Sequence, residues 1–359
     1  MSDYVCKVFD TAGVLQFVVS DYSSLNYLSK VNAPGLLQVG LRGDHPLLAS
    51  VADKWQIEVW RRLPGAAFAR DFVGMVRQQE FYQSDRATTI LTCPGLLSML
   101  RWRHVLWFAG VGNRSQFTAL PAETVAKTLV TYNATGSASV VEGRNRAGAI
   151  TGLTVQADGA TGETVDWFCS WANLLETLQE LAQVGGGDFD LVKTGAAAWD
   201  FRWYDGQLGT DRSATVAFAL QRGNMANPQY KELRMEEATV AVVGGQGEGS
   251  SRAVAVRTGA DYGAGNDIEM FVNAADVTTI AGLQARGDTA LIERQARREF
   301  TFDVLQTPAC QYGEHYFLGD LVTAVNPFTG ASVTLKVDQV RIQLDGMGGE
   351  TIDVQMAAI

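Results

Sequence analysis

The sequence predicts an α+β fold that is mostly β. Apolar residues alternate with polar or small ones in the first and last thirds of the 359-residue chain, and this alternation is the period of a β-strand. Amphipathic helices are predicted in few places, of which residues 165–187 are the clearest. Glycine is abundant, at 37 residues, and proline is modest, at 8, which suits a strand-rich chain rather than a disordered one.

The bulk properties of the chain exclude several classes of protein. Its length suits two or three domains. The formal net charge of -10 argues against a protein that binds nucleic acid by neutralising phosphates. The N-terminus MSDYVCKVFD is charged and lacks the hydrophobic core of a secretory signal, and no apolar run approaches membrane-spanning length. We expect a protein that is made in a cytoplasm and has no stable membrane insertion.

Shifts in pattern divide the chain into four predicted segments. They are a first β domain at 1–110, an α/β domain at 111–195, a β-rich segment at 196–275, and a second β domain at 276–359. In the first segment, strands are predicted at 71–82 and 87–95, and a short helical turn at 95–101. Gly74 lies inside the first of these strands, where it predicts a bulge or the close approach of another backbone.

The α/β segment contains two predicted helices. The first begins at Pro121 and Glu123 and ends at Gly136. Its buried stripe is expected to be Val125, Leu129 and Tyr132. The second helix has a stripe that consists of Trp171, Leu174, Leu175, Leu178, Leu181 and Ala182. Gly185 supplies the left-handed residue that ends this helix, and we interpret its tryptophan-rich face as core rather than as a cofactor site.

The third segment returns to strands. They are predicted at 199–206, 213–220 and 237–257. The last range contains a glycine-rich loop at 244–252, which has some features of a phosphate cradle. It lacks the Gly-Lys-Ser/Thr ending, no helix follows it, and Glu248 would repel phosphate. We therefore interpret the loop as the tip of a hairpin.

The fourth segment begins with a helix near 277–298. Its apolar stripe is Ile280, Leu283, Leu291 and Ile292. The arginines of its last turns suit the negative end of a helix dipole, and they are Arg294, Arg297 and Arg298. Four strands are predicted after it, at 300–304, 316–322, 333–344 and 351–356. A slip in the alternation at Asp338 and Gln339 predicts a β-bulge.

The residues that could carry chemistry form no convincing site. The cysteines lie far apart and are interpreted as buried free thiols, Cys6, Cys93, Cys169 and Cys310. The histidines, which are not paired at metal spacing, are His45, His104 and His315. Glu314, His315 and Asp320 could hold a cation, but a turn that leads into a strand is the better interpretation. We predict no catalytic, cofactor-binding or metal-binding residue.

A pair of aspartates invites an enzymatic interpretation. Asp188 and Asp190 flank Phe189 at the start of a strand, so their side chains face the same side. Paired carboxylates for glycoside hydrolysis need a partner that is distant in sequence and lies in the same cleft. The sequence offers many candidates for that partner and singles out none.

Five motifs follow one another in a specific order. They are NLLETLQELAQVGG (173–186), VAVVGGQGEGSSRAV (240–254), FVNAADV (271–277), GDTALIERQARREFTFDV (287–304) and YGEHYFLGDLVTA (312–324). Their order and spacing resemble the ReqiPepy-type siphophage tail protein family. In that family a Gly-Glu-Gly loop follows a strand, here Gly247 to Gly249. A Tyr-x-Leu-Gly-Asp strand lies near the C-terminus, here Tyr316 to Asp320. The N-terminal HPLLA and WQIEVWRR stretches also fit.

The resemblance implies a fold with two β-barrel-like, tube-forming domains and an α/β domain inserted between them. Segment 1–110 would be the first barrel, and segment 196–275 would be shared between the α/β domain and the second barrel. Segment 276–359 would be the second barrel, with its helix covering strands at 300–305 and 316–325. No peptidase or carbohydrate-binding extension is expected after Ile359.

The resemblance also implies a structural role. Such proteins are tail hubs of long-tailed phages, and they are homotrimers in the virion, at the tail tip. Their partners would be the distal tail ring, tail-tip or receptor-binding fibre proteins and the tape measure protein. DNA would pass through the lumen without sequence-specific binding, and assembly would take place in the cytoplasm of the bacterial host. No enzyme activity and no cofactor are implied.

Two other functions stay open from the sequence. One is a tail-associated hydrolase of cell-wall glycans or peptides, which needs carboxylates that converge in a pocket. The other is a module that binds host-surface carbohydrate by stacking sugars on exposed aromatic residues such as Trp199 and Trp203.

Overall fold

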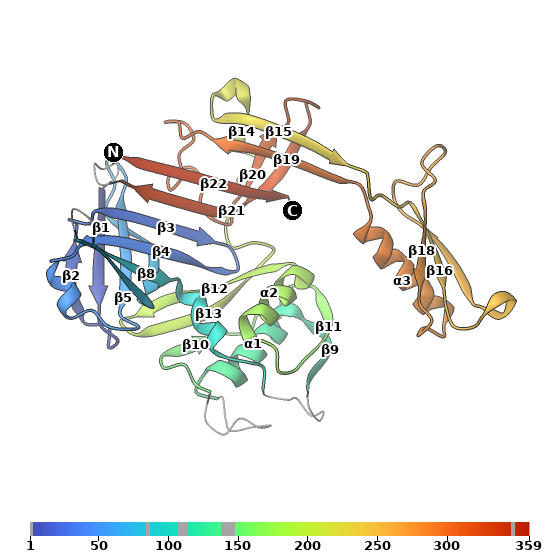
Figure 1. Ribbon diagram of the computed structural model, residues 1–359, viewed down its shortest axis with the longest axis horizontal. Coiled ribbons are helices and arrows are strands. Elements are labelled where there is room, and N and C mark those ends of the chain that lie inside the picture. Colours follow the sequence, from blue (N-terminus) through green and yellow to red (C-terminus); the bar gives the residue numbers. More distant parts are fainter. Residues whose placement is uncertain (1–2, 84–86, 107–113, 138–147, 346–348, 359) are drawn as a thin grey trace. The chain divides into compact units, whose positions relative to one another are not determined.

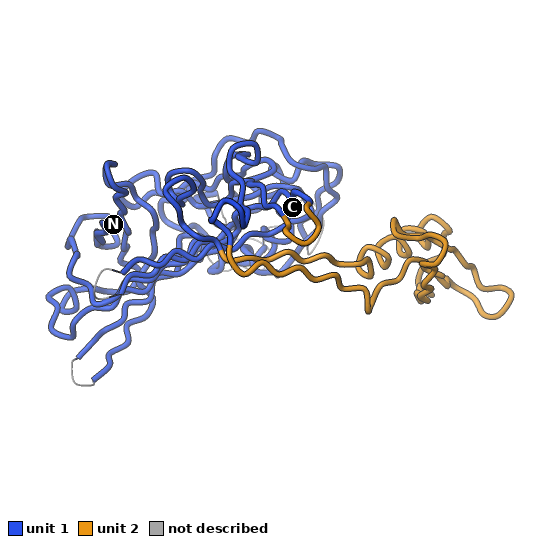
Figure 2. The backbone as a smooth tube through the Cα atoms, turned by 90° about the horizontal axis from the view of Figure 1, so that it is seen from above, with its two compact units in different colours: residues 1–225, 304–325, 331–359 blue, residues 226–303, 326–330 orange. Residues whose placement is uncertain are grey.

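The structure is a computed structural model that describes residues 3–83, 87–106, 114–137, 148–345 and 349–358. The chain divides into two compact units, which Figure 2 distinguishes by colour. Unit 1 comprises residues 1–225, 304–325 and 331–359, and unit 2 comprises residues 226–303 and 326–330. Strands account for 49% of the chain and helices for 17%, which confirms the mostly β prediction. Within the described residues, no sheet closes into a barrel.

Unit 1 contains an eight-stranded sheet, called here the large sheet (Figure 1). Its strands are β3 (Ser24–Lys30), β4 (Ala33–Arg42), β7 (Gln78–Gln83), β8 (Ala87–Pro94), β14 (Ala217–Phe218), β20 (Leu321–Val325), β21 (Ser332–Leu344) and β22 (Glu350–Ala358). Their order is β14-β20-β21-β3-β4-β8-β7, and β22 pairs with β21. The first and last parts of the chain therefore share one sheet.

Strand β21 joins three neighbours because β20 and β3 pair with different parts of it. Its first residues pair with β20, and its later residues pair with β3. Against β22 the register shifts between Val337 and Gln339, which confirms the bulge predicted at this point.

A four-stranded sheet packs against the large sheet. Its order is β2-β1-β5-β6, with β1 (Asp3–Phe9), β2 (Leu15–Val19), β5 (Gln56–Arg62) and β6 (Ala69–Met75). The ring of Tyr27, on the large sheet, lies 6.5 Å from the ring of Tyr4 and 5.8 Å from that of Phe72. Buried side chains from both sheets thus form one core between them.

The single strand predicted at 71–82 is wrong, because this stretch is two strands in two sheets. Strand β6 ends at Met75 in the four-stranded sheet, and β7 begins at Gln78 in the large sheet. The close approach predicted at Gly74 is confirmed: a Cβ there would lie 2.6 Å from the carbonyl oxygen of Cys93. The strand predicted at 87–95 is β8, and the helical turn predicted at 95–101 is the 3₁₀-helix η2, Leu96–Trp102.

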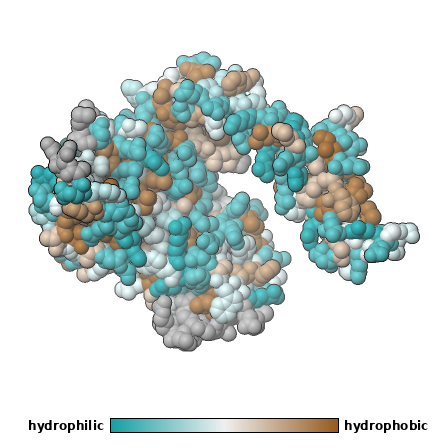
Figure 3. All heavy atoms as spheres, viewed as in Figure 1, coloured by the Kyte–Doolittle hydropathy of each residue, from teal (hydrophilic) through white to brown (hydrophobic). Residues whose placement is uncertain are grey.

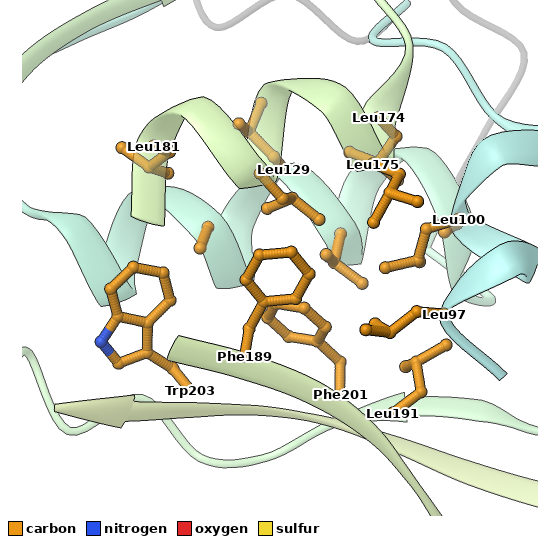
Figure 4. Close-up of a cluster of buried hydrophobic side chains, with 14 of the residues drawn as sticks. Leu97, Leu100, Leu129, Leu174, Leu175, Leu181, Phe189, Leu191, Phe201 and Trp203 are labelled. Atoms are coloured by element: carbon orange, nitrogen blue, oxygen red, sulfur yellow. The ribbon is translucent and has the colours of Figure 1, made fainter. Parts of the chain in front are cut away.

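The α/β part of unit 1 packs two helices on small sheets. The helices are α1 (Ala122–Ala134) and α2 (Leu174–Gly185). The strands are β9 (Ser115–Pro121), β10 (Leu153–Val155), β11 (Thr164–Cys169), β12 (Gly187–Gly195) and β13 (Ala198–Asp205). Figure 4 shows Leu129 of α1 and Leu174, Leu175 and Leu181 of α2 above Phe189 and Phe201 of the sheet. This cluster is the second core of unit 1.

Most of the predicted stripes of these helices are confirmed, but two aromatic residues are exceptions. Tyr132 is exposed, and so is Trp171, which has a positive φ of 61° and precedes the helix. Helix α2 begins after Asn173, whose side chain accepts a hydrogen bond from the backbone N–H of Leu175 at 3.1 Å. The left-handed residue at its end is Gly186 and not Gly185.

Unit 2 is built around one helix and a three-stranded sheet. Helix α3 (Ile280–Glu293) covers one face of the sheet β17-β16-β18, formed by β16 (Val240–Gly244), β17 (Val254–Thr258) and β18 (Glu269–Asn273). A separate ribbon pairs β15 (Met225–Leu233) with β19 (Arg297–Val304). The face of the three-stranded sheet opposite α3 stays open, and Figure 3 shows hydrophobic residues gathered over β16 and β18.

Three predictions about the fourth segment need correction. Leu283 and Leu291 are buried, but Ile280 and Ile292 are exposed, because only one narrow side of α3 meets the sheet. Arg297 and Arg298 lie in β19 and not in the helix, since the alternation of that strand extends back to them. Helix α3 packs on β16 and β17, whose small residues face it, and not on the strands near 300–305 and 316–325.

Two further predicted strands are much shorter in the structure. The one at 316–322 begins only at Leu321, because Asp320 accepts a hydrogen bond from the N–H of Phe317 at 2.8 Å and closes a turn. In the stretch 213–220 only β14 is a strand. The remaining 3₁₀-helices are η1 (Pro46–Ala49), η3 (Leu220–Arg222) and η4 (Gly249–Ser251). None of the described helices has the length and apolar character needed to cross a membrane.

Candidate functional site

The open face of the large sheet carries a row of uncharged polar side chains, which we call the amide row. Its members come from five adjacent strands and pair in register: Gln343, Asn26, Gln38, Thr92 and Gln78. Side chains of alternate residues point to opposite faces of a sheet. On the other face the alternating residues are buried and apolar, among them Leu25, Tyr27, Leu37, Leu91 and Ile342. The amide row is therefore held by a rigid, well-packed layer.

The electrostatics of this face are close to neutral. Charged residues of both signs flank the amide row. Lys30, Arg42, Glu80 and Arg341 lie on strands of the row, Asp353 lies on the neighbouring strand β22, and Asp345 follows β21. A hollow of about 390 Å³ lies over part of the row, with Asn26, Gln38 and Gln343 among its lining residues. The Oδ1 atom of Asn26 is buried and finds no hydrogen-bond partner among the described residues. The face thus offers amides to a polar partner and no concentration of charge.

A buried polar cluster fastens the last strand of the large sheet. The guanidinium of Arg61, on β5, donates to Glu350 of β22 at 2.8 Å, and the hydroxyl of Tyr4 donates to the same carboxylate. Arg61 also lies 5.8 Å from the rings of Tyr4 and Tyr312. Removal of either charged partner would leave the other charge buried without compensation. The cluster therefore fixes β22 at the edge of the sheet.

Asp188 and Asp190 have different roles although they share one side of β12. Asp188 is buried and accepts hydrogen bonds from Lys336 at 2.9 Å, Asn32 at 2.8 Å and the N–H of Leu208 at 2.8 Å. It ties the α/β part to the large sheet. Asp190 is different, because burial raises its pKa to about 7, against the opposing effects of the Leu191 N–H and the charge of Arg202.

One cavity brings two carboxyl groups together, which bears on the hydrolase hypothesis. Asp71 and Asp190 both line a cavity of about 220 Å³ in unit 1. The hydroxyl of Tyr27 donates to Asp71 at 2.5 Å. Burial raises the pKa of Asp71, while the hydrogen bond from Tyr27 and the charge of Arg61 oppose the rise. Asp71 is thus held by a hydrogen bond to a side chain of the core. None of the described residues that line the cavity is a histidine.

His45 and His315 hold local backbone structure, in a helix cap and in the turn predicted near Glu314, respectively. His45 accepts the N–H of Leu47 at 3.2 Å and caps η1. His315 accepts the N–H of Gln311 at 3.1 Å. Asp320 is buried and accepts from Arg212 at 2.7 Å and from the N–H of Thr210 at 2.6 Å. Within the described residues, no group of three or more His, Cys, Asp or Glu residues could hold a metal ion.

Three further sequence interpretations have clear outcomes. The loop at 244–252 joins the antiparallel pair β16–β17, which confirms the hairpin, and Arg252 closes it by donating to the carbonyl of Gly245 at 3.1 Å. Trp199 and Trp203 are buried in the core of the α/β part, so the expectation that they are exposed for sugar stacking is wrong. All four cysteines are free, and Cys169 is only partly buried.

Sequence reasoning missed the amide row. Its members are single polar residues in alternating strands, and each has the pattern of an ordinary solvent-facing position. Only the pairing of strands from distant parts of the chain places them side by side. The alternation within each strand can be seen in the sequence. The register between neighbouring strands cannot.

Comparisons with known proteins agree with this architecture. The family model described as siphovirus ReqiPepy6 Gp37-like protein matches residues 5–356. No curated protein matches the chain. The structure is similar to the 43 kDa tail protein of prophage MuSo2 from Shewanella oneidensis, with a TM-score of 0.58 and 13% identity, over 99% of this chain and 98% of that chain.

Two other solved structures share the fold. A tail protein from Neisseria meningitidis MC58 has a TM-score of 0.54 and 12% identity, over 99% of this chain and 96% of that chain. A chain of the Francisella PdpA-VgrG complex has a TM-score of 0.55 and 6% identity, over 100% of this chain and 58% of that chain. At these identities the structures show a common fold, and the match of the family model over nearly the whole sequence shows the family. The chain belongs to the siphovirus ReqiPepy6 Gp37-like family of phage tail proteins.

Proposed function

We propose that this tail protein is the hub at the distal end of a long-tailed phage, where it forms a homotrimer. It joins the distal tail ring to tail-tip or receptor-binding fibre proteins, meets the tape measure protein, and guides the DNA channel. It assembles in the cytoplasm of the bacterial host and stays in the virion as a structural part without enzymatic activity. Membership of a tail protein family supports the virion location.

The observation that carries this proposal is the amide row. A channel wall must be close to DNA without binding it, and affinity for DNA comes largely from cations that displace counterions from phosphates. The amide row offers uncharged side chains across five strands, and the charges that flank it are of both signs. In our proposal this face of the large sheet lines the channel. The net charge of -10 further disfavours phosphate binding.

The proposed domain arrangement follows the four segments of the sequence. The β segments at 1–110 and 276–359 would supply the tube-forming, barrel-like domains, with 196–275 shared, and the α/β segment at 111–195 would lie beside them. Strands β3 and β21, from the first and the last segment, pair in one sheet, which supports their joint role in a wall. The similarity to a chain of a PdpA-VgrG complex supports the use of this fold in larger assemblies.

The channel can be tested in phage particles that carry lysines in the amide row. Asn26→Lys with Gln38→Lys adds two cations to the wall, and we expect normal particles whose DNA is released more slowly, most clearly at low salt. Gln156→Lys, at an exposed position in the α/β part, is the matched control and should release DNA at the normal rate. If the double variant, the control variant and the unaltered phage release DNA at the same rate, the amide row does not line the channel.

The oligomeric state has an independent test. Light scattering on the purified chain should give a mass near three times 38.8 kDa, and the distal tail ring should add its own mass to that of the trimer. A monomer that persists in the presence of the distal tail protein would contradict the trimer. Degradation of host peptidoglycan by the purified protein, lost on Asp190→Asn, would instead favour the hydrolase.

A further inference from the structure

A second cavity of unit 1, of about 500 Å³, is rich in hydrogen-bond donors. Arg212, Arg222 and His315 line it together with Thr215 and Thr307, and Glu314 is the one acidic residue among the described lining residues. Its volume lies in the range of small-molecule sites, which is roughly 300 to 1,000 Å³. None of the described lining residues belongs to the amide row of the proposed channel.

Arg212 is held in place by a buried acid. Its Nε atom donates to Oδ2 of Asp320 at 2.7 Å, and the guanidinium lies 5.2 Å from the ring of Phe317. Asp320 is itself fixed by the N–H groups of Thr210 and Phe317. An arginine has five N–H donors in a planar fork. The contact uses Nε, and Arg212 is itself one of the lining residues of the cavity.

Arg222 is presented by a rigid turn. The buried side chain of Asn224 accepts from the N–H of Ala219 at 2.9 Å and donates to the carbonyl of Ala217 at 3.0 Å, which fixes the backbone on both sides of η3. Gly223 follows Arg222 with a positive φ of 66°, a conformation that favours glycine. The Arg222 side chain is exposed and forms no ion pair with any described residue.

His315 adds a donor from the opposite loop. Its Nδ1 atom accepts the N–H of Gln311 at 3.1 Å, so the neutral ring carries its proton on Nε2. The same loop is pinned by Gln306, which accepts the N–H of Tyr312 at 2.9 Å and donates to the hydroxyl of Tyr316 at 3.0 Å. The donors thus come from the segments before and after β14 and from the loop of His315, and hydrogen bonds hold these segments in fixed conformations.

We propose that this cavity binds an oxyanion, either the carboxylate of an acidic polypeptide segment or a phosphate group. Two arginines and a histidine line the cavity, and arginine binds carboxylate and phosphate oxygens through paired hydrogen bonds. Two arginines at one cavity stand out in a chain with a net charge of -10. The three residues that could have indicated a cation site therefore have another role. His315 lines an anion site, Asp320 orients Arg212, and the charge of Glu314 opposes the binding of an anion.

Calorimetric titration of the full chain tests this proposal with two probes, inorganic phosphate and a hexaglutamate peptide. We expect at least one probe to bind, and Arg222→Gln to weaken that binding by about tenfold, or about 1.4 kcal/mol. Arg222→Lys should restore part of the loss, because it returns the charge without the fork. Arg101→Gln, an exposed arginine in η2, is the matched control and should bind like the unaltered chain.

The two probes separate the sources of the oxyanion. Tighter binding of hexaglutamate than of phosphate identifies a polypeptide carboxylate, and the reverse order identifies phosphate. Glu314→Gln should strengthen binding of either probe, which a merely structural role for Glu314 would not produce. The proposal is overturned if neither probe binds, or if Arg222→Gln and His315→Gln both bind as well as Arg101→Gln. These outcomes do not depend on the channel, so this proposal and the hub can fail separately.

Discussion

Unit 1 and unit 2 bury their apolar side chains to very different extents. In unit 1 the large sheet packs on the four-stranded sheet, and a second core lies under helices α1 and α2. In unit 2 one helix covers one face of a three-stranded sheet, and the buried core is limited to Ala241, Val243, Ala255, Ala274, Leu283 and Leu291. The opposite face exposes Val254, Val256 and Phe271. Since apolar burial is the main favourable contribution to folding, unit 2 should be much the less stable of the two.

The largest effect is expected from Leu291→Asp in unit 2. Leu291 is 5% exposed, and an aspartate there would be a buried charge without a partner. We expect a loss of about 4 kcal/mol or more, which this small core cannot tolerate. Hydrogen exchange should then be fast throughout β16–β18 and unchanged in α1 and α2. If the amides of β16–β18 stay protected from exchange in this variant, the stability of unit 2 does not depend on this core.

A smaller loss is expected from Phe201→Ala in unit 1. The ring of Phe201 is fully buried, 5.8 Å from the ring of Phe189. Truncation leaves a cavity, and the free energy of unfolding of unit 1 should fall by about 3–4 kcal/mol. The larger core should keep the unit folded, with a lower denaturant midpoint. Complete unfolding of this variant in buffer would reverse the order of stability proposed for the two units.

Glu123→Gln tests a buried ion pair of unit 1. Burial raises the pKa of Glu123, but hydrogen bonds from Lys127, Thr161 and Gly159 outweigh it and lower the pKa to about 2. A folded-state pKa below the unfolded value stabilises the protein above the unfolded pKa, and this stabilisation is lost as pH falls through the folded pKa. We expect the variant to lose about 1–3 kcal/mol near pH 7. The difference from the unaltered chain should shrink between about pH 4.5 and pH 2, which acid titration of the unfolding midpoint can measure.

The smallest effect is expected from Phe271→Ala on the open face of unit 2. Phe271 is 60% exposed, and the centre of its ring lies 5.2 Å from the guanidinium carbon of Arg252. Its removal should change the stability of unit 2 by less than about 1 kcal/mol. Both this variant and Phe201→Ala replace phenylalanine by alanine. Comparing them therefore shows how far the burial of the ring, rather than the residue type, determines the loss of unfolding free energy. A loss as large as that of Phe201→Ala would mean that the open face is covered in solution.

Much of the secondary structure was predictable, because period and capping are local properties. The bulge in β21 and the hairpin at 244–252 followed from the pattern of neighbouring residues. Errors arose where a distant contact decides the local structure. The turn closed by Asp320 shortened a predicted strand, and the exposure of Ile292 depends on which side of α3 meets the sheet.

The candidate sites were less predictable than the fold. The amide row depends on the pairing of strands from both ends of the chain, and no local pattern encodes that register. The cavity of Arg212 and Arg222 depends on the segments before and after β14 and on the loop of His315, which the large sheet brings together. The one signal in the sequence was the group formed by Glu314, His315 and Asp320. It indicated the correct loop, but it suggested a cation as the ligand, whereas we propose an anion.

The pairing of β3 with β21 has a consequence for synthesis. Strand β3 is among the first to leave the ribosome, but its partner on one side is Gln339 to Leu344, near the end of the chain. The large sheet therefore cannot be completed during translation, and until release β3 keeps one edge unpaired and prone to misassociation. An incomplete translation product would lack β21 and β22 as well as the Arg61–Glu350 contact. Because its sheet is unfinished, such a product would be degraded by proteases before it could be incorporated into a phage particle.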